Sequence, residues 1–253
     1  MGLALLQLLV KVAMANVQAP PRPLRLHLVR HGQTDANLAG ICQGQTDGWL
    51  LTPLGRKQAH ALGATLAGVD FHELHCSDLG RTKETTALAL AERSHLLESV
   101  SYDKRLRELM LGWRQGKRFG DPPEPGAEKA NPPEPIADVS VRATSWLMDL
   151  IERNAAPEEE ALVEGATATR NVFVMSHGGF LNCMFRDVLQ VVDEKMKLGN
   201  CCITIVDVVY DVNGGHRFEL RSLAEDDHVL NLENYPAPAA GLTDADVYND
   251  LPI

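Results

Sequence analysis

Two histidines and two arginines stand where predicted buried strands of this chain end. Arg30 and His31 follow the apolar run LRLHLV (24–29), and His177 follows the run NVFVMS (171–176). Arg81 falls in the first turn of a helix that comes after the short strand ELHCSD. An imidazole can act near neutral pH as a nucleophile, an acid or a base, and a guanidinium matches the geometry of phosphate oxygens. These residue types therefore predict phosphate chemistry, provided that the fold brings them together.

The elements around these residues predict an α/β fold. Helices are expected over residues 52–68, 79–92, 139–154 and 177–189. Thr52 with Pro53 can start the first helix and Gly68 can end it, while Ser77 or Asp78 can cap the second. Strands that alternate with helices indicate a three-layer α/β/α sandwich with a mostly parallel central sheet. Ligands of such sheets bind beyond the carboxyl ends of the strands, where the histidines and arginines fall.

The predicted helix starts at this edge favour an anion. Unpaired N–H groups and a partial positive charge are typical of a helix N-terminus. Gly32 and Gly178 would let the backbone approach a ligand closely. His31 alone is compatible with an ordinary surface histidine, but its combination with Arg81 and His177 favours a phosphate pocket.

The remaining segments suggest one domain with two extensions. Residues 1–23 read as a flexible N-terminal extension, 24–225 as the domain, and 226–253 as a tail. Two more strands, over 201–211 and 216–223, form an expected hairpin across Asn213-Gly214-Gly215. The stretch 102–120 lacks a clear period and predicts loop with short helical pieces. The six prolines that follow, between residues 121 and 135, predict an irregular surface excursion.

The composition limits which classes of partner the protein can bind and in which compartment it is expected. The 253 residues carry a formal net charge of −10, which argues against nucleic acid and anionic membranes but allows a small anionic substrate. The five cysteines form no CxxC pair, so buried thiols in a cytoplasmic protein are expected, with a redox role for Cys201-Cys202 as the weaker alternative. The leader is too short and polar for a membrane span. Two alternatives are that the leader targets the protein to an organelle and that the protein starts at Met14.

Five motifs together resemble a known family. LVRHGQTDAN, LTPLGRKQA, SDLGRTKET, LREL with a following LG, and SHGG occur in this order between residues 24 and 225. They resemble the histidine phosphatase superfamily, which is phosphoglycerate-mutase-like. Within it, QGQTDGWLLTPLGRKQA and YDKRLRELMLGWRQGK are most similar to the TIGAR-type fructose-2,6-bisphosphatases.

The resemblance implies a role for each residue. His31 would attack phosphorus, with its other ring nitrogen donating to a backbone carbonyl. Arg30, Arg81 and a protonated His177 would stabilise the transferred group. Glu108 would be the acid, with a pKa raised enough to hold a proton; the alternative is a surface partner of Arg105 or Arg107. The implied substrate contacts are Gly32, Asn37, Gln43, Gly44 and Gly178. No metal or other cofactor is implied, and HELH (72–75) is no zinc motif.

Two departures from the family pattern concern substrate choice. Trp113-Arg114-Gln115-Gly116 replaces the usual Trp-Glu-Gly, and PPEPIADVSVRA (132–143) replaces a Gly-Glu-Ser/Thr stretch. Lys117 and Arg118 could hold a second phosphate or be plain exposed charges. The sequence thus predicts a phosphatase of small phosphorylated metabolites, with fructose 2,6-bisphosphate as the leading substrate. A mutase, a protein phosphatase and a non-catalytic phosphate-binding scaffold are the alternatives; the oligomeric state is not predicted.

Overall fold

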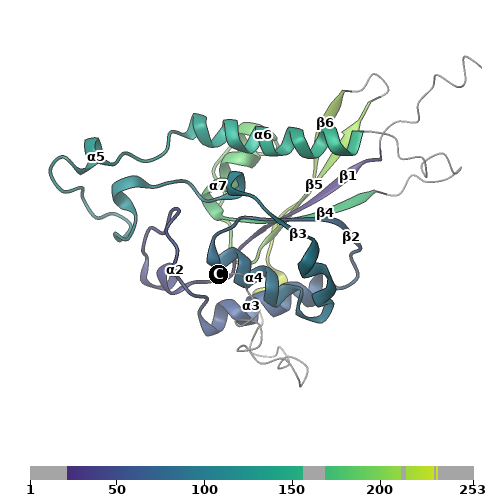
Figure 1. The fold of residues 1–253 in the computed structure, drawn as a ribbon, viewed down its shortest axis with the longest axis horizontal. Coiled ribbons are helices and arrows are strands. Elements are labelled where there is room, and N and C mark those ends of the chain that lie inside the picture. The colour runs from purple at the N-terminus through teal and green to yellow at the C-terminus, as the bar shows by residue number, and fades with distance from the viewer. Residues whose placement is uncertain (1–21, 156–168, 212–214, 231, 233–253) are drawn as a thin grey trace, which may run out of the picture.

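A single six-stranded sheet forms the centre of the molecule in the computed structural model, which describes residues 22–155, 169–211, 215–230 and 232 (Figure 1). The strands are β1 (Leu24–Arg30), β2 (Phe71–Cys76), β3 (Val100–Tyr102), β4 (Arg170–Ser176), β5 (Ile203–Tyr210) and β6 (His216–Glu225). Their order in the sheet is β3-β2-β4-β1-β5-β6. The first four in this order are parallel, and β5 and β6 add an antiparallel edge. The predicted mostly parallel sheet is confirmed.

Helices cover both faces of the sheet, as a three-layer sandwich requires. One face carries α3 (Pro53–Thr65) and α4 (Gly80–Ala89), and the other carries α6 (Ile136–Ala155) and α7 (Gly178–Cys183) (Figure 1). Alternate residues of β1 serve the two layers: Leu26 packs in the cluster with Trp146 of α6, whereas Val29 packs with Leu62 of α3. This period of two is what a strand buried on both faces dictates.

The helix boundaries agree with the sequence at one start and differ at two other places. Thr52 Oγ1 accepts from the Gly55 N–H (3.0 Å), so Thr52 caps α3 as expected. This helix ends at Thr65 with Leu66 as its cap, so the prediction that Gly68 ends it was wrong. The prediction of Ser77 or Asp78 as the cap of α4 was also wrong, because Leu79 occupies that place. Both polar side chains have other partners: Ser77 binds His177, and Asp78 pairs with Arg107.

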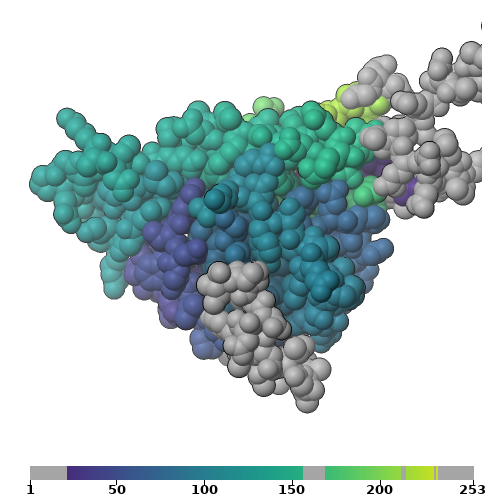
Figure 2. Space-filling view, in the orientation of Figure 1, coloured from purple at the N-terminus to yellow at the C-terminus, as the bar shows by residue number. Residues whose placement is uncertain are grey.

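The segment between β3 and α6 has little regular structure, as its prolines predict. It contains 3-10 turns at Lys104–Leu106 and Gly112–Arg114 and the short helix α5 (Ala127–Ala130). The part around α5 extends to one side beyond the sheet (Figures 1 and 2). Backbone hydrogen bonds join residues 40–42, which follow α2 (Asp35–Ala39), to residues 116–119. The long segment is therefore tied to the carboxyl edge of the sheet.

The remaining described elements are three short helical segments. A 3-10 helix, Ala91–Ser99, follows α4, and a π-helical turn, Met184–Val188, follows α7. The start of the expected tail forms α8 (Asp227–Leu230), whose Val229 packs against the α3-side core. The extension up to residue 21, the hairpin turn at 212–214 and the tail beyond 232 lie outside the described residues.

Two global features of the described part bear on the composition argument. All five cysteines are free and buried, which agrees with the prediction of buried thiols. Among the described helices, none combines the length and the apolar character that crossing a membrane needs.

Candidate active site

The predicted site residues meet at the carboxyl edge of three neighbouring strands. In the sheet register, Arg30 of β1 lies opposite Ser176 of β4, and Cys76 of β2 lies opposite Met175. The parallel register continues for one bond beyond the strands, from the His31 N–H to the Ser176 carbonyl (3.0 Å). The His31 and His177 rings are consequently neighbours, with centroids 5.2 Å apart.

His31 is held as a neutral imidazole with one free nitrogen. Its Nδ1 lies 2.7 Å from the carbonyl of Gly32, and because a carbonyl only accepts, Nδ1 carries the proton and Nε2 has the lone pair. The predicted bond to a backbone carbonyl is therefore present. The side chain is buried, and burial together with the charges of Arg81 and Arg30 holds the pKa of His31 well below its usual value. This is the state that an imidazole nucleophile requires.

Arg30 and Arg81 supply two fixed positive charges beside His31. Arg30 donates from Nη1 to the Leu198 carbonyl (2.5 Å), and Arg81 donates to the carbonyls of Gly44 (2.7 Å) and Thr46 (3.1 Å). The Nε of each is buried and has no hydrogen-bond partner within the described chain. Burial lowers the pKa of Arg81 to about 10, which still leaves it a cation at neutral pH. Two cations with buried, unused N–H donors are suited to bind an anion.

His177 caps the N-terminus of α7 and is oriented by Ser77. Its Nε2 lies 2.8 Å from Ser77 Oγ, while its buried Nδ1 has no partner among the described residues. Burial and the neighbouring Arg81, His31 and Arg30 hold the pKa of His177 well below its usual value. The free protein thus contains a neutral His177, which differs from the protonated imidazole expected during transfer. A bound dianion would have to raise that pKa.

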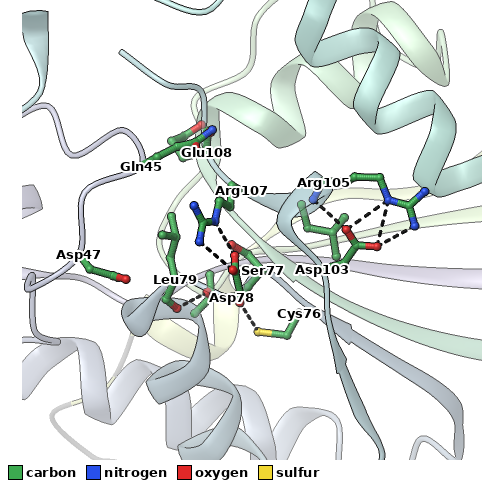
Figure 3. Close-up of polar contacts among 12 residues, drawn as sticks. Gln45, Asp47, Cys76, Ser77, Asp78, Leu79, Asp103, Arg105, Arg107 and Glu108 are labelled. Atoms are coloured by element: carbon green, nitrogen blue, oxygen red, sulfur yellow. Dashed lines mark hydrogen bonds and ion pairs between the residues drawn. The ribbon is translucent and has the colours of Figure 1, made fainter. Parts of the chain in front are cut away.

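Glu108 lies at the same helix end and faces the site. Its carboxylate accepts from the N–H groups of Gly179 (3.0 Å), Phe180 (2.8 Å) and Leu109 (2.9 Å). The alternative surface partners are occupied elsewhere: Arg107 pairs with Asp78 and Arg105 with Asp103 (Figure 3). Within the described structure, Glu108 therefore lies at the border of the candidate site and forms no ion pair with Arg105 or Arg107.

Of the expected substrate contacts, some have atoms free to bind a ligand, and others already form hydrogen bonds within the protein. Gln43 is buried with an unpartnered Oε1, and Gly178 lies against the Arg30 side chain. Asn37, in contrast, uses its Oδ1 in a capping box with Thr34 at the start of α2.

Gly32 and Gly44, two more of the predicted substrate contacts, are each required by the local backbone structure. The Gly32 N–H donates to Thr85 Oγ1 (3.0 Å), and a Cβ at this position would lie 2.7 Å from the Gly55 carbonyl oxygen. Gly44 has a φ of +54° and turns its carbonyl to Arg81. Gly32 lets the chain just after β1 approach the first turn of α3 closely, and Gly44 shapes the loop that holds Arg81.

The structure also adds residues that the sequence did not single out for the site. The sequence predicts Ser77 only as a possible helix cap and gives Gln45 no role of its own. Arg142 of α6 donates to the carbonyls of Arg105, Arg107 and Glu108 and pairs with Glu134. Its helical position gave no signal, because the carbonyls that it binds are invisible in a sequence pattern.

The departures from the family pattern now have local explanations. Lys117 pairs with Glu124, both largely exposed, which supports the reading of a plain surface charge. The segment 132–143 supplies Glu134 and Arg142. These two side chains bind the backbone of residues 105–110, called the acid segment below because it contains Glu108.

The HELH stretch belongs to a separate polar cluster. Although burial opposes it, hydrogen bonds from His75, Asn154 and Arg153 lower the pKa of Glu73 to about 2. The described residues contain no group of three or more His, Cys, Asp or Glu side chains arranged to hold a metal ion.

Comparison with known proteins decides the family. The family model described as histidine phosphatase superfamily, branch 1, matches residues 26–220. The chain belongs to the histidine phosphatase superfamily. The predicted phosphoglycerate-mutase-like family, and with it an enzyme of the histidine phosphatase kind, is thereby confirmed.

Relatives in this superfamily carry both phosphatase and mutase names. A broad-specificity phosphatase of Saccharomyces cerevisiae is 30% identical over 220 residues, covering 81% of this chain and 87% of the relative. A probable phosphoglycerate mutase of Erwinia tasmaniensis is 29% identical, covering 73% and 85%. Among solved structures, a mycobacterial glucosyl-3-phosphoglycerate phosphatase is 29% identical with a TM-score of 0.64, covering 81% of this chain and 100% of that one. These relatives fix the superfamily and leave the substrate open.

Proposed function

We propose that this histidine phosphatase hydrolyses phosphate monoesters of small metabolites through a phosphohistidine at His31. The observation that carries the proposal is the state of His31: a buried imidazole, fixed through Nδ1, whose pKa is held well below its usual value by burial and by the charges of Arg81 and Arg30. Such an arrangement supplies a nucleophile and preorganised positive charge in one place.

The reaction has two balanced steps. In the first, the lone pair of His31 Nε2 forms a bond to phosphorus, the bond from phosphorus to the ester oxygen breaks, and Glu108 gives its proton to the leaving oxygen. In the second, water attacks the phosphohistidine and passes a proton to Glu108, and the N–P bond breaks to release phosphate and neutral His31. Arg30 and Arg81 stabilise the oxygens of the transferred group in both steps.

Hydrolysis is the first candidate reaction because relatives named as phosphatases support it. Transfer back to the substrate, as in a mutase, is the second candidate and is favoured by the relative named as a probable phosphoglycerate mutase. Both reactions use the same pocket and differ in whether water or substrate takes the phosphoryl group.

For the substrate, we keep fructose 2,6-bisphosphate as the first compound to test, because the motifs around residues 43–60 and 102–117 resemble the TIGAR-type enzymes. Lys117, one of the residues considered for a second phosphate, is engaged by Glu124 and gives this assignment no support. Phosphoglycerates and glucosyl-3-phosphoglycerate are the other compounds that the relatives' names suggest.

The test is a substrate panel with a matched inactive variant. Wild-type enzyme and the His31→Ala variant would be incubated with fructose 2,6-bisphosphate, 3-phosphoglycerate, glucosyl-3-phosphoglycerate and p-nitrophenyl phosphate. Released phosphate and isomer interconversion would both be measured. We expect phosphate release by the wild type and none by the variant. Isomer interconversion without phosphate release would favour the mutase, and full activity of the variant would refute the mechanism.

We also propose the cytoplasm as the location, since five free, buried thiols suit a reducing compartment. Fluorescence from a C-terminal fusion in the source cells would test this. Colocalisation with an organelle marker would contradict it.

A further inference from the structure

Two glutamines join the loop that holds Arg81 to the segment that carries Glu108. Gln115 Oε1 accepts from the backbone N–H of Gln45 (2.8 Å) and from that of Leu111 (3.2 Å). Gln45 Nε2 in turn donates to the carbonyl of Glu108 (2.9 Å). We call Gln45 and Gln115 the glutamine clasp.

The clasp reaches the phosphoryl pocket through the loop 43–46. Arg81 binds the carbonyls of Gly44 and Thr46, the residues on either side of Gln45. The Gln115 side chain also fills the space next to Gly44 that a Cβ would need. Gln115 thus contacts the loop that holds Arg81, and this loop is the fixed side against which the segment carrying Glu108 is positioned.

The clasp reaches the acid through the main chain of Glu108. The carbonyl of this residue accepts from Gln45 and from Arg142 Nη2 (3.1 Å), while the carboxylate is held by α7. Figure 3 shows Gln45 lying beside Glu108. The acid is thus anchored to the pocket that it must serve by one bond from the side chain of Gln45.

From these contacts we infer that Gln115 is a positioning residue, which through Gln45 sets the distance between the Glu108 acid and the phosphoryl pocket. The inference rests on the proposed function, since it assigns Gln115 a part in that reaction. A misplacement of about 1 Å between catalytic groups can cost about 100-fold in rate.

The backbone makes a clean test feasible. Next to the clasp, Cys42 donates to the Lys117 carbonyl (2.8 Å), and Gly116 donates to the Cys42 carbonyl (2.9 Å). These main-chain bonds do not depend on the side chain of Gln115. A substitution there is consequently expected to leave the two segments paired and the protein folded.

The experiment compares substrates that differ in their need for an acid. A p-nitrophenolate group leaves without a proton, whereas the alkoxide of glycerol 3-phosphate needs one. For Gln115→Leu we expect kcat on glycerol 3-phosphate to fall about 100-fold and kcat on p-nitrophenyl phosphate to change less than about threefold. Gln115→Glu keeps an acceptor oxygen and should restore most of the lost rate. Lys129→Leu, on exposed α5, is the control.

A double variant adds a second readout. In the Glu108→Gln background, Gln115→Leu should cause no further loss on glycerol 3-phosphate, because the acid that it positions is already gone. Equal losses on both substrates, no loss on either, or additive losses in the double variant would each overturn the role of Gln115. A wild type inactive on both substrates would overturn the proposed function and the clasp's role with it.

Discussion

Ser77 links His177 to the start of α4 through its hydroxyl and its backbone carbonyl. Its Oγ lies 2.8 Å from His177 Nε2, and its backbone carbonyl accepts from Thr82 Oγ1 (2.8 Å) at the start of α4. The hydroxyl fixes the imidazole plane before any ligand arrives, which spares reorganisation in the reaction.

Removing this hydroxyl should weaken catalysis more than stability. For Ser77→Ala we expect kcat/KM to fall about 10-fold, because His177 loses its only described partner on Nε2, and the free energy of unfolding to fall by about 1 kcal/mol. Steady-state kinetics and urea denaturation measure the two effects. Ser99→Ala, whose hydroxyl donates to the Leu96 carbonyl at the surface, is the control. Unchanged kinetics in Ser77→Ala would remove Ser77 from the site.

The two buried histidines predict a pH response with a definite sign. Burial and the nearby arginines hold the pKa values of His31 and His177 well below 6.5, so both imidazoles stay neutral as the pH falls through that value. The unfolded chain binds these protons at about pH 6.5, so the free energy of unfolding should decrease as the pH drops below it.

Nitrogen-15 NMR of the labelled imidazoles measures this directly. We expect the His31 and His177 signals to remain those of neutral rings well below pH 6.5. Addition of vanadate, which stands for the phosphoryl group, should raise the pKa of His177 because an anion favours the charged ring. Titration of both rings at about pH 6.5 in the free protein would contradict the buried, cation-flanked site.

At the scale of elements, Arg142 ties α6 to the acid segment. Its guanidinium donates to three backbone carbonyls and pairs with Glu134, and both side chains are about one-sixth exposed. A charge held in this way is costly to unpair, because its carbonyl and carboxylate partners would lose their donors together.

We expect Arg142→Leu to lower the free energy of unfolding by about 3 kcal/mol. The matched control is Arg153→Leu on the same helix, where the arginine is half exposed and pairs with Glu73, so the loss should stay below about 1 kcal/mol. Urea denaturation compares the two. Equal losses would show that Arg142 is no structural anchor.

Much of the fold was predictable because strand and helix periods depend on local sequence. The buried run 24–29 and the capped start at Thr52 were placed correctly, and the convergence of His31 with His177 followed from the rule for strand ends. The cap of α4 was not predicted correctly. The sequence gives no sign that Ser77 binds His177 and that Asp78 binds Arg107.

Site contacts that use the backbone were harder to predict still. Gln115 and Arg142 act on carbonyls and N–H groups, which every residue carries. Sequence patterns identify side-chain types, and therefore find the nucleophile and cations before the residues that hold them.

At the scale of the whole molecule, a negatively charged protein gathers two arginines at the edge of the sheet where we propose that an anion binds. The chain has a net charge of −10, yet the partly buried Arg30 and the buried Arg81 lie at the edge of the sheet, each with a buried Nε that has no partner among the described residues. The surrounding layers hold these charges in place without substrate. Binding of a phosphate analogue should therefore stabilise the fold as a whole.

At a vanadate concentration 100 times its Kd, the stabilisation should be about 2.7 kcal/mol, or roughly 5–10 °C in Tm. The shift should be largely lost in Arg81→Met, measured against that variant's own Tm. Differential scanning calorimetry checks both. A shift of equal size in the variant would place the anion elsewhere.

The most direct measurement of the account is the covalent intermediate itself. Enzyme mixed with phosphorus-32-labelled substrate and quenched within one turnover would be digested and its labelled peptide sequenced. We predict an acid-labile, base-stable label on the peptide that contains His31, and no label in His31→Ala. A label on another residue, or turnover without any phosphorylated protein, would contradict a reaction through phospho-His31.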